Sequence, residues 1–278
     1  MGVNSLKNSL RLFSILFLLF SMSVLLIACS GSGNNDDSSD TETTETEEAT
    51  DNDGGITKLV AGTDATYAPM EYIEDGEIVG IDIDIVNAIA EELGIEVEFK
   101  NVGWEPLFPA VNNGEVDFAV SSITITDERK EEFDFTEPYY VANQLILVPE
   151  DSDISSFEDL KDKKVSVQIN TTGHHVVKDL LGETSPNIVA TETMPLAITE
   201  MLNGNADASV GDNSTVNEYI KNNPDVKVKT IEDDSFEKEY YGLMVKKGNT
   251  EVLELLNEGI KKIKENGKLE EITGFKLE

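Results

Sequence analysis

The chain has 278 residues, with 55 acidic and 21 basic side chains and a formal net charge of −34. A charge of this sign argues against nucleic acid or an anionic lipid surface as a partner, because both are negatively charged themselves. The length allows two domains of ordinary size.

The first 28 residues have the pattern of a lipoprotein signal peptide. Lys7 and Arg11 form a basic start, and the apolar run LFSILFLLFSMSVLLIA follows. This run leads into LIACSG, which resembles a lipobox, so that Cys29 would carry a diacylglycerol chain after cleavage. Stable anchoring to the membrane takes two acyl chains. The alternative is a buried cysteine in a membrane helix.

Cys29 is the chain's only cysteine, which leaves no internal disulfide and no thiolate metal site. We expect no metal and no cofactor. Residues 29–56 are expected to be a disordered tether, because residues 30–55 hold nine acids, no base and no large apolar side chain. The body that follows has 19 basic and 46 acidic residues, a net charge of −27.

The body alternates short apolar strands with amphipathic helices. In its first half, we expect strands at 58–62, 95–100 and 116–122 and helices at 82–93 and 105–114. In its second half, we expect strands at 163–169, 187–192, 207–212 and 226–231 and helices at 174–182, 195–204 and 214–223. This alternation predicts an α/β architecture with mostly parallel sheets.

Two segments of the body match each other without a gap. AVNNGEVDFAVSS at 110–122 and EMLNGNADASVGD at 200–212 each read as a helix, an Asn-Gly stop and a short buried strand. The first ends in two serines and the second in Gly-Asp. Since open α/β sheets bind ligands at the carboxyl ends of their strands, two similar lobes that face each other would form a cleft.

The body is similar to the extracellular solute-binding proteins of polar amino-acid ABC importers, the family of the lysine/arginine/ornithine-, histidine- and glutamine-binding proteins, and in particular to arginine-type binding lipoproteins. The similarity covers nearly all of residues 57–270. Its motifs are GTDATYAPMEY, IVGIDIDIVNAIAEELG, SSITITDERKEEFDFTEPYY, VQINTTG and GDNSTVNEY. The C-terminus, LEEITGFKLE, departs from the family pattern because it lacks the usual aromatic-rich lysine helix.

This resemblance implies a two-lobed, venus-flytrap fold with two doubly wound α/β sheets joined by a two-strand hinge. Lobe 1 would hold residues 57–144 and 240–278, and lobe 2 residues 148–236, with crossovers near 145–149 (LILVP) and 237–242 (EKEYYG). A free amino acid would bind to one lobe and be enclosed by hinge closure. The protein would be a monomer, anchored by its lipid to the extracellular face of the cytoplasmic membrane, and would dock on a membrane permease.

The resemblance also assigns a site for the ligand's α-carboxylate. Arg129 is the only arginine outside the signal peptide, beside eighteen lysines. Its planar fork would hold both carboxylate oxygens, which a lysine cannot do. Thr124 and the backbone amide of Thr172, at a helix N-terminus, would complete this site. The alternative is a surface ion pair of Arg129 with Asp127 or Glu132.

Asp212 should accept the ligand's α-ammonium, with help from Ser122. The alternative is that Asp212 is the N-cap of the helix that follows it, a common use of aspartate. His174 and His175 are adjacent on one helix and lack the spacing of a helical metal pair. We therefore interpret them as solvent-facing.

The side-chain pocket would be formed by Asp64, Tyr67 and Trp104, with Ser121 as a further contact. Arg129 balances the charge of the ligand's carboxylate and Asp212 that of its ammonium, so Asp64 is an additional carboxylate in the pocket. Glu105 is a second acid expected near it. A basic ligand would satisfy Asp64 and could stack on Trp104. We therefore expect arginine first, then lysine or histidine. Glutamine, whose amide can also donate to Asp64, is the alternative, and ordinary core packing is the alternative role for Trp104.

Two other classes of function are considered. A few relatives on this fold catalyse dehydration of cyclic acids, but no motif here pairs a poised base with a second acid, so we do not expect an enzyme. A ligand sensor would need a spanning helix and an output domain, which we do not expect either.

Overall fold

The computed structural model describes residues 55–277 of the chain. The predicted signal peptide, Cys29 and nearly all of the predicted tether therefore lie outside the described residues. Within residues 55–277, no helix combines the length and the hydrophobicity that crossing a membrane requires.

The first lobe is built on a five-stranded sheet with the strand order β5-β1-β6-β15-β7. Its strands are β1 (Lys58–Thr63), β5 (Glu96–Asn101), β6 (Phe118–Ala119), β7 (Phe133–Phe135) and β15 (Met244–Lys246). Its helices are α1 (Ile81–Leu93), α2 (Trp104–Asn113), α3 (Asp127–Glu132), α7 (Thr250–Glu265) and α8 (Lys268–Thr273). A small antiparallel sheet of β2 (Thr66–Tyr67), β3 (Glu71–Glu74) and β4 (Glu77–Val79) leads into α1.

The second lobe is built on a sheet with the order β11-β10-β12-β9-β13. Its strands are β9 (Gln144–Pro149), β10 (Val165–Gln168), β11 (Ile188–Thr191), β12 (Ala208–Asp212) and β13 (Val228–Ile231). Its helices are α4 (Thr172–Leu181), α5 (Met194–Leu202) and α6 (Asn213–Asn222), with a short 3-10 helix η1 (Glu158–Leu160) before β10. Apolar side chains of β9, β10, β12, η1 and α4 pack together in the core of this lobe.

The prediction of mostly parallel sheets is confirmed, with one antiparallel strand in each sheet. In the first sheet β1 pairs in parallel with β5 and β6, whereas β15 pairs antiparallel with β6 and β7. In the second sheet β10 pairs in parallel with β11 and β12, whereas β9 pairs antiparallel with β12 and β13. The antiparallel pairs arise because β9 and β15 each enter their sheet directly after the chain has crossed from the other lobe.

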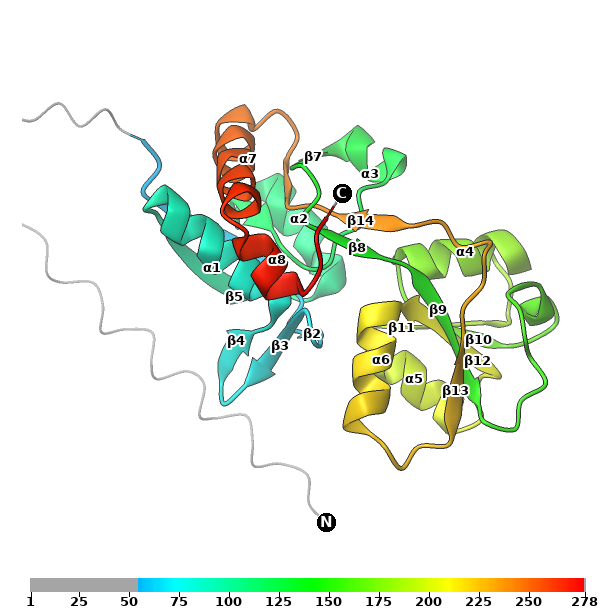
Figure 1. Ribbon diagram of the computed structural model, residues 1–278. Helices are drawn as coiled ribbons and strands as arrows, with labels where there is room; N and C mark the ends of the chain where they lie inside the picture. Colours follow the sequence, from blue (N-terminus) through cyan, green and yellow to red (C-terminus); the bar gives the residue numbers. More distant parts are fainter. Residues whose placement is uncertain (1–54, 278) are drawn as a thin grey trace, which may run out of the picture. The chain divides into compact units, whose positions relative to one another are not determined.

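The chain crosses between the lobes in a two-stranded antiparallel sheet of β8 (Tyr140–Ala142) and β14 (Glu239–Tyr241) (Figure 1). β14 lies within the predicted crossover at 237–242. The first crossover lies at 140–142 rather than at 145–149, because 145–149 belongs to β9, which is buried between β12 and β13. Gln144, which the sequence assigned to lobe 1, therefore belongs to the second sheet. Phe275 of the atypical C-terminus packs edge-on against Tyr140 of β8, with ring centroids 5.1 Å apart.

The two matching segments have the same structure. α2 and α5 are each followed by a glycine with a left-handed backbone, Gly114 with φ of 74° and Gly204 with φ of 76°. The strands that follow, β6 and β12, each occupy the third position of a five-stranded sheet. A glycine adopts this backbone without the steric cost that a Cβ would add.

An aspartate fixes the start of the strand in both segments. The Oδ2 atom of Asp117 accepts a hydrogen bond from the backbone N–H of Val60 at 2.7 Å. The Oδ2 atom of Asp207 accepts one from the backbone N–H of Lys164 at 2.8 Å. Each aspartate thus bonds the neighbouring parallel strand or the residue just before it, so the internal match of the sequence reflects a shared framework.

Gly80 ties the small sheet to the start of α1. Its φ is 130°, and a Cβ at this position would lie 2.2 Å from the carbonyl oxygen of Met70. The backbone N–H groups of Ile81 and Asp82 donate to the carbonyl oxygens of Pro69 and Met70 at 3.0 and 2.9 Å. This close contact places Glu71, the residue after Met70, beside Asp82.

Candidate functional site

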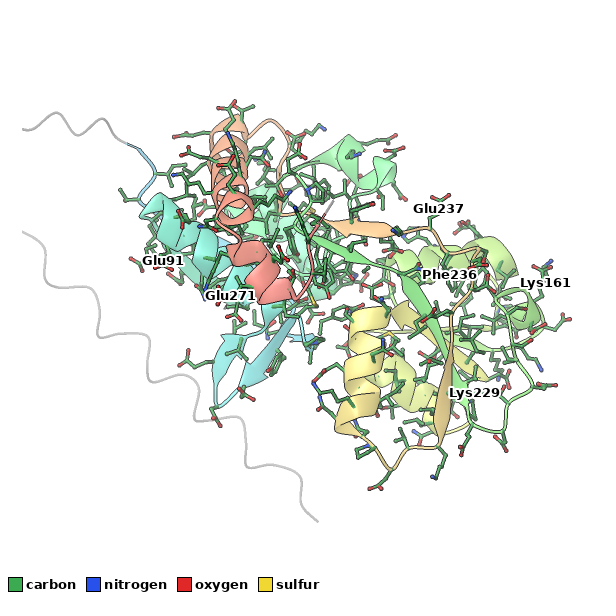
Figure 2. All side chains as sticks on the ribbon, in the orientation of Figure 1. Glu91, Lys161, Lys229, Phe236, Glu237 and Glu271 are labelled. Carbon is green, nitrogen blue, oxygen red and sulfur yellow. The ribbon has the colours of Figure 1, made fainter. Side chains whose placement is uncertain are left out.

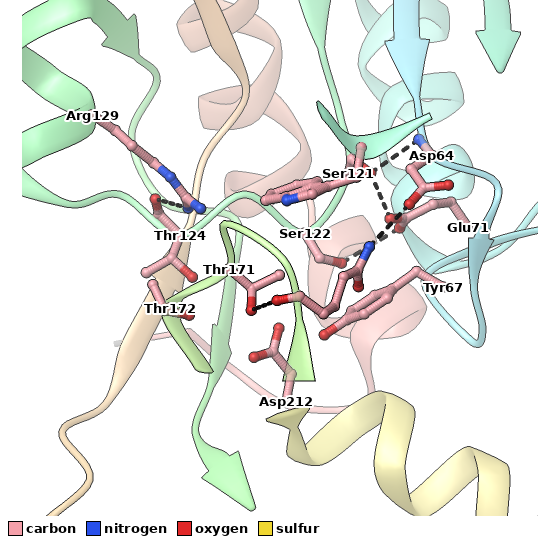
Figure 3. Close-up of a pocket in the computed structure, with 12 residues that line it drawn as sticks. Asp64, Tyr67, Glu71, Ser121, Ser122, Thr124, Arg129, Thr171, Thr172 and Asp212 are labelled. Carbon is pink, nitrogen blue, oxygen red and sulfur yellow. Dashed lines mark hydrogen bonds between the residues drawn. The ribbon is translucent and has the colours of Figure 1, made fainter. Parts of the chain in front are cut away.

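A cavity lies between the lobes and is lined by twelve residues (Figure 3). From the first lobe these are Asp64, Tyr67, Glu71, Trp104, Ser121, Ser122, Thr124 and Arg129, and from the second Gln168, Thr171, Thr172 and Asp212. The structure brings all nine sequence-predicted ligand contacts together around one cavity, although their roles in binding stay predictions. The sequence analysis missed Glu71, Gln168 and Thr171.

Arg129 lies on α3 and reaches across to the second lobe. Its Nη1 donates to the carbonyl oxygen of Thr124 at 2.9 Å and its Nη2 to that of Asn170 at 3.3 Å. The guanidinium carbon lies 5.4 Å from the ring centroid of Trp104 and 5.6 Å from that of Phe108. These contacts hold the planar fork at the cavity wall and leave it without a carboxylate partner among the described residues.

The alternative reading of Arg129 as half of a surface ion pair is not seen. Among the described residues, neither Asp127 nor Glu132 forms a salt bridge with it, and Asp127 pairs with Lys130 at 3.6 Å instead. Burial lowers the pKa of Arg129, while the nearby charges of Glu239 and Asp212 oppose that shift. A guanidinium remains charged under such a shift and is available to an anion.

Asp212 stands at the N-cap position of α6 but does not act as a side-chain cap. Its Oδ1 accepts from Nε2 of Gln144 at 2.6 Å and its Oδ2 from the hydroxyl of Tyr241 at 2.5 Å. Burial, and then the charge of Glu239, raise the pKa of Asp212 to about 6. The carboxylate therefore belongs to the cavity rather than to the helix terminus, which answers the N-cap alternative.

Glu71 is a buried carboxylate in the cavity wall that the sequence analysis did not single out. It is fully buried and accepts from the hydroxyls of Ser121 at 2.8 Å and Ser122 at 3.4 Å. Asp82, equally buried, accepts from the backbone N–H of Ser122 at 2.7 Å and the hydroxyl of Tyr139 at 2.9 Å. The available signal was one acid between apolar residues in the motif APMEY.

Burial is the main cause that raises the pKa of both carboxyl groups. It raises the pKa of Asp82 to about 6, and it raises that of Glu71 well above its usual range, with the charge of Asp82 adding to the shift. Two buried carboxyls this close do not both ionise easily. The charge of Asp82 thus disfavours the ionised form of Glu71.

Asp64 lies at the end of β1 and is 3 % exposed. Its Oδ1 accepts from the hydroxyl of Thr66 at 3.0 Å, and its Oδ2 accepts from Nε2 of Gln168 at 3.2 Å. Because Gln168 comes from the second lobe, this bond joins the two sides of the cavity. Burial raises the pKa of Asp64.

Trp104 combines the two roles that the sequence left open. It is 7 % exposed and packs in a core cluster with Leu107 and Phe133. The same ring lines the cavity and contacts the guanidinium of Arg129. Tyr67 also lines the cavity (Figure 3), and burial together with the charge of Asp212 raises the pKa of Tyr67.

The threonines of the predicted carboxylate site differ from expectation in one respect. Thr172 begins α4, so its backbone N–H lies at a helix N-terminus as predicted. The hydroxyls of Thr124 and Thr172, however, donate to the carboxylate of Glu239 at 2.6 and 2.8 Å. A hydroxyl has a single proton, so the Thr124 hydroxyl cannot also donate to a ligand carboxylate in this arrangement.

The structure also shows where Glu105 and the two histidines lie. Glu105 bonds Nδ2 of Asn170 at 2.7 Å and does not line the cavity. His175 is exposed as predicted, but His174 is 7 % exposed and accepts from the backbone N–H of Asn170 at 3.0 Å, so the prediction for His174 is wrong. No cluster of potential metal ligands occurs among the described residues.

Two α/β lobes joined by a two-strand hinge, with a polar cavity between them, define a two-lobed ligand-binding protein. The comparison of sequences is more specific. The chain belongs to the bacterial extracellular solute-binding proteins, family 3, whose sequence pattern matches residues 59–274.

Proteins that are similar to this chain are named for different ligands. A protein of Neisseria gonorrhoeae named "Probable histidine-binding protein" is 38 % identical over 223 residues, which are 80 % of this chain and 82 % of the relative. The glutamine-binding protein GlnH of Bacillus subtilis is 33 % identical over 269 residues, 94 % of this chain and 95 % of the relative. The solved arginine-, lysine-, histidine-binding protein ArtJ of Geobacillus stearothermophilus is 44 % identical, with a TM-score of 0.76 over 80 % of this chain and 97 % of ArtJ.

Proposed function

We propose that this protein captures a free L-amino acid with a basic side chain, arginine first and then lysine or histidine, and delivers it to the permease of an ABC importer. The observation that carries the proposal is the charge of the cavity wall. Three buried carboxyl groups, those of Asp64, Glu71 and Asp212, face a single cation, Arg129.

A free amino acid with a neutral side chain leaves this wall unbalanced. Its carboxylate would meet Arg129 and its ammonium would meet Asp212, which leaves Asp64 and Glu71 without a cation. Both carboxyl groups accept hydrogen bonds, but burial still disfavours their charged form when no cation faces them. A guanidinium, ammonium or imidazolium on the ligand's side chain offsets that cost.

Glutamine is the second candidate, and one contact favours it. Asp64 already accepts a hydrogen bond from the side-chain amide of Gln168, so a neutral amide can satisfy this carboxylate. Relatives named for glutamine as well as for arginine and histidine are consistent with either ligand.

Enclosure of the ligand follows from contacts that join the lobes. Arg129 donates to Asn170 and Gln168 donates to Asp64, so each end of the cavity is held by a bond from one lobe to the other. We propose that β8 and β14 bend when the lobes open and that these bonds re-form on closure.

The setting of this function is a proposal that rests on the N-terminal sequence. Cys29 would carry the lipid, the acidic tether would separate the body from the membrane, and the body would act as a monomer. Cys29→Ala should release the protein from the membrane fraction or leave it unprocessed. Cleaved wild-type protein in the medium without lipid on Cys29 would remove the anchor from the proposal.

A thermal-shift panel of the free amino acids tests the ligand class. A ligand that binds only the native state raises the melting temperature. We expect arginine to give the largest shift, followed by lysine and histidine, with agmatine and free guanidinium as controls for the side chain alone. A panel in which no amino acid raises the melting temperature would overturn the proposed function.

A further inference from the structure

The hinge strand β14 places a carboxylate beside the cavity without lining it. Glu239 is half-buried, and it accepts three hydrogen bonds. Its Oε2 accepts from the hydroxyls of Thr124 at 2.6 Å and Thr172 at 2.8 Å, and its Oε1 accepts from Nε2 of Gln144 at 2.9 Å. Thr124 belongs to the first lobe, and Thr172 and Gln144 belong to the second.

These bonds decide what the two threonines can offer to a ligand. Thr124 and Thr172 line the cavity, and each has given its only hydroxyl proton to Glu239. A carboxylate oxygen accepts these protons, so both hydroxyls can act toward a ligand only as acceptors. The hydroxyl oxygen of Thr124 has both lone pairs free, whereas that of Thr172 already accepts one hydrogen bond from Nε2 of Gln144 at 3.2 Å. A ligand carboxylate, which has acceptors alone, cannot bond to them. A ligand ammonium, which has three donors, can.

The same network continues to Asp212. The amide of Gln144 donates to Asp212 at 2.6 Å as well as to Glu239, and Tyr241 of the same hinge strand donates to the other oxygen of Asp212. Glu239 and Tyr241, two residues apart on β14, therefore bond to three residues that line the cavity, namely Thr124, Thr172 and Asp212.

We infer that Glu239 is a positioning residue for the ligand's α-ammonium. It holds the hydroxyls of Thr124 and Thr172 as acceptors, which join Asp212 in a set of oxygens for the ammonium. The α-carboxylate is then left to Arg129 and the backbone N–H groups at the start of α4. This inference rests on the proposed function, since it concerns how the same cavity tells the two ends of an amino acid apart.

The test uses three ligands that differ only at the α-carbon. L-arginine carries both groups, agmatine lacks the carboxylate, and 5-guanidinopentanoic acid lacks the ammonium. Competition calorimetry gives the affinity of each for the wild type and for Glu239→Gln, which keeps the size of the side chain but adds a donor. We expect Glu239→Gln to weaken L-arginine and agmatine by about tenfold and 5-guanidinopentanoic acid by less than about twofold.

Glu237→Gln is the matched control. Glu237 is an exposed acid two residues earlier, on the segment that leads into β14 (Figure 2), and makes no hydrogen bond through its side chain among the described residues. The Glu237→Gln substitution removes the same charge near the hinge. The affinities for all three ligands should therefore stay within about twofold of the wild type.

A second variant keeps the inference testable if Glu239→Gln folds poorly. Thr124→Val removes one of the acceptors that Glu239 orients, so it should weaken the two ammonium-bearing ligands and spare 5-guanidinopentanoic acid. An equal loss for all three ligands in both variants would mean a role in hinge closure alone and would overturn the inference. A loss confined to the two carboxylate-bearing ligands would overturn it as well.

The proposed function has a separate outcome. If the wild type binds L-glutamine and not L-arginine, the same three-way comparison is made with L-glutamine, 4-aminobutanamide and glutaramic acid, and the expected pattern is unchanged. If the wild type binds no amino acid, the proposed function fails and this inference fails with it.

Discussion

The helix–strand units at 110–122 and 200–212 share a framework and differ at their ends. Both stop the helix with a left-handed glycine, anchor the strand with an aspartate on a backbone N–H, and place the strand third in its sheet. The first unit then ends in Ser121 and Ser122, which donate to buried Glu71, whereas the second ends in Asp212, itself a buried acceptor.

This difference shows how two units with the same framework can present different side chains to one cavity. The shared residues form bonds within one lobe and position the strand ends. The residues at the strand ends differ in chemistry: the first unit has serine hydroxyls that donate to Glu71, and the second has the carboxylate of Asp212. Substitutions can break the framework, the chemistry or the match between the two units.

The largest effect is expected at Gly80, which has no counterpart in the second lobe. Gly80→Ala adds a Cβ that would lie 2.2 Å from a backbone oxygen at a φ of 130°, so we expect a loss of about 3–5 kcal/mol in the free energy of unfolding. Gly76→Ala is the control, because it has positive φ but open space. Equal urea midpoints for the two variants would contradict the close contact with Met70.

Arg129→Lys changes the chemistry of the first unit's side of the cavity without changing its charge. A lysine ammonium cannot hold two carboxylate oxygens in a planar fork, so we expect the free energy of ligand binding to weaken by about 2–5 kcal/mol. Lys130→Gln, an exposed neighbour, should leave binding unchanged. Near wild-type affinity of the lysine variant in a calorimetric titration would remove the carboxylate role.

The second unit's end should make binding depend on pH. Asp212 has its pKa raised from 3.8 to about 6, and a ligand ammonium requires its ionised form. The affinity for L-arginine should therefore fall by about tenfold as the pH is lowered from 7 to 5. A flat affinity profile over this range would contradict the assignment.

The same raised pKa has the opposite consequence for the empty protein. The protonated form of Asp212 is favoured in the folded state, so its stabilising contribution is present below pH 3.8 and is lost as the pH rises to about 6. Asp82, whose pKa is also raised to about 6 by burial, adds a contribution of the same sign. Thermal melts of the ligand-free protein measure this trend.

The smallest effect tests the shared framework. Asp117→Asn and Asp207→Asn each weaken a bond to a backbone N–H, and we expect a loss of about 1 kcal/mol of stability in each case, with ligand affinity unchanged. Asp117→Asn should lower the stability more than Asp207→Asn does, because Asp117 is half-buried and Asp207 is exposed. A change of affinity in either variant would show that framework and cavity are coupled.

Local patterns in the sequence were sufficient for the elements and for the residues at strand ends. The helix from 81 to 93 and the strand from 58 to 63 follow from apolar spacing, and the motif around Arg129 located one side of the cavity. The direction of β9 and β15 was not predictable in this way, because it depends on where the chain re-enters a sheet after crossing between lobes.

The missed residues act through contacts distant in sequence. Thr124 and Glu239 are separated by 115 residues and Asp64 and Gln168 by 104, and no local pattern relates them. Glu71 was hidden for another reason: its neighbours are apolar, and only the close approach at Gly80 reveals that Asp82 lies beside it. His174 was misjudged because helical spacing alone does not show which face is covered.

Competition between L-arginine and L-glutamine for the ligand-free protein, followed by calorimetry at pH 7.5, tests most directly the proposal that the acidic cavity wall selects a basic amino acid. The three carboxyl groups facing one guanidinium predict that L-arginine displaces L-glutamine and binds at least about tenfold more tightly. Asp64→Asn should narrow that ratio. Glutamine binding tenfold more tightly than arginine, or an arginine affinity that Asp64→Asn leaves untouched, would contradict this selection by charge.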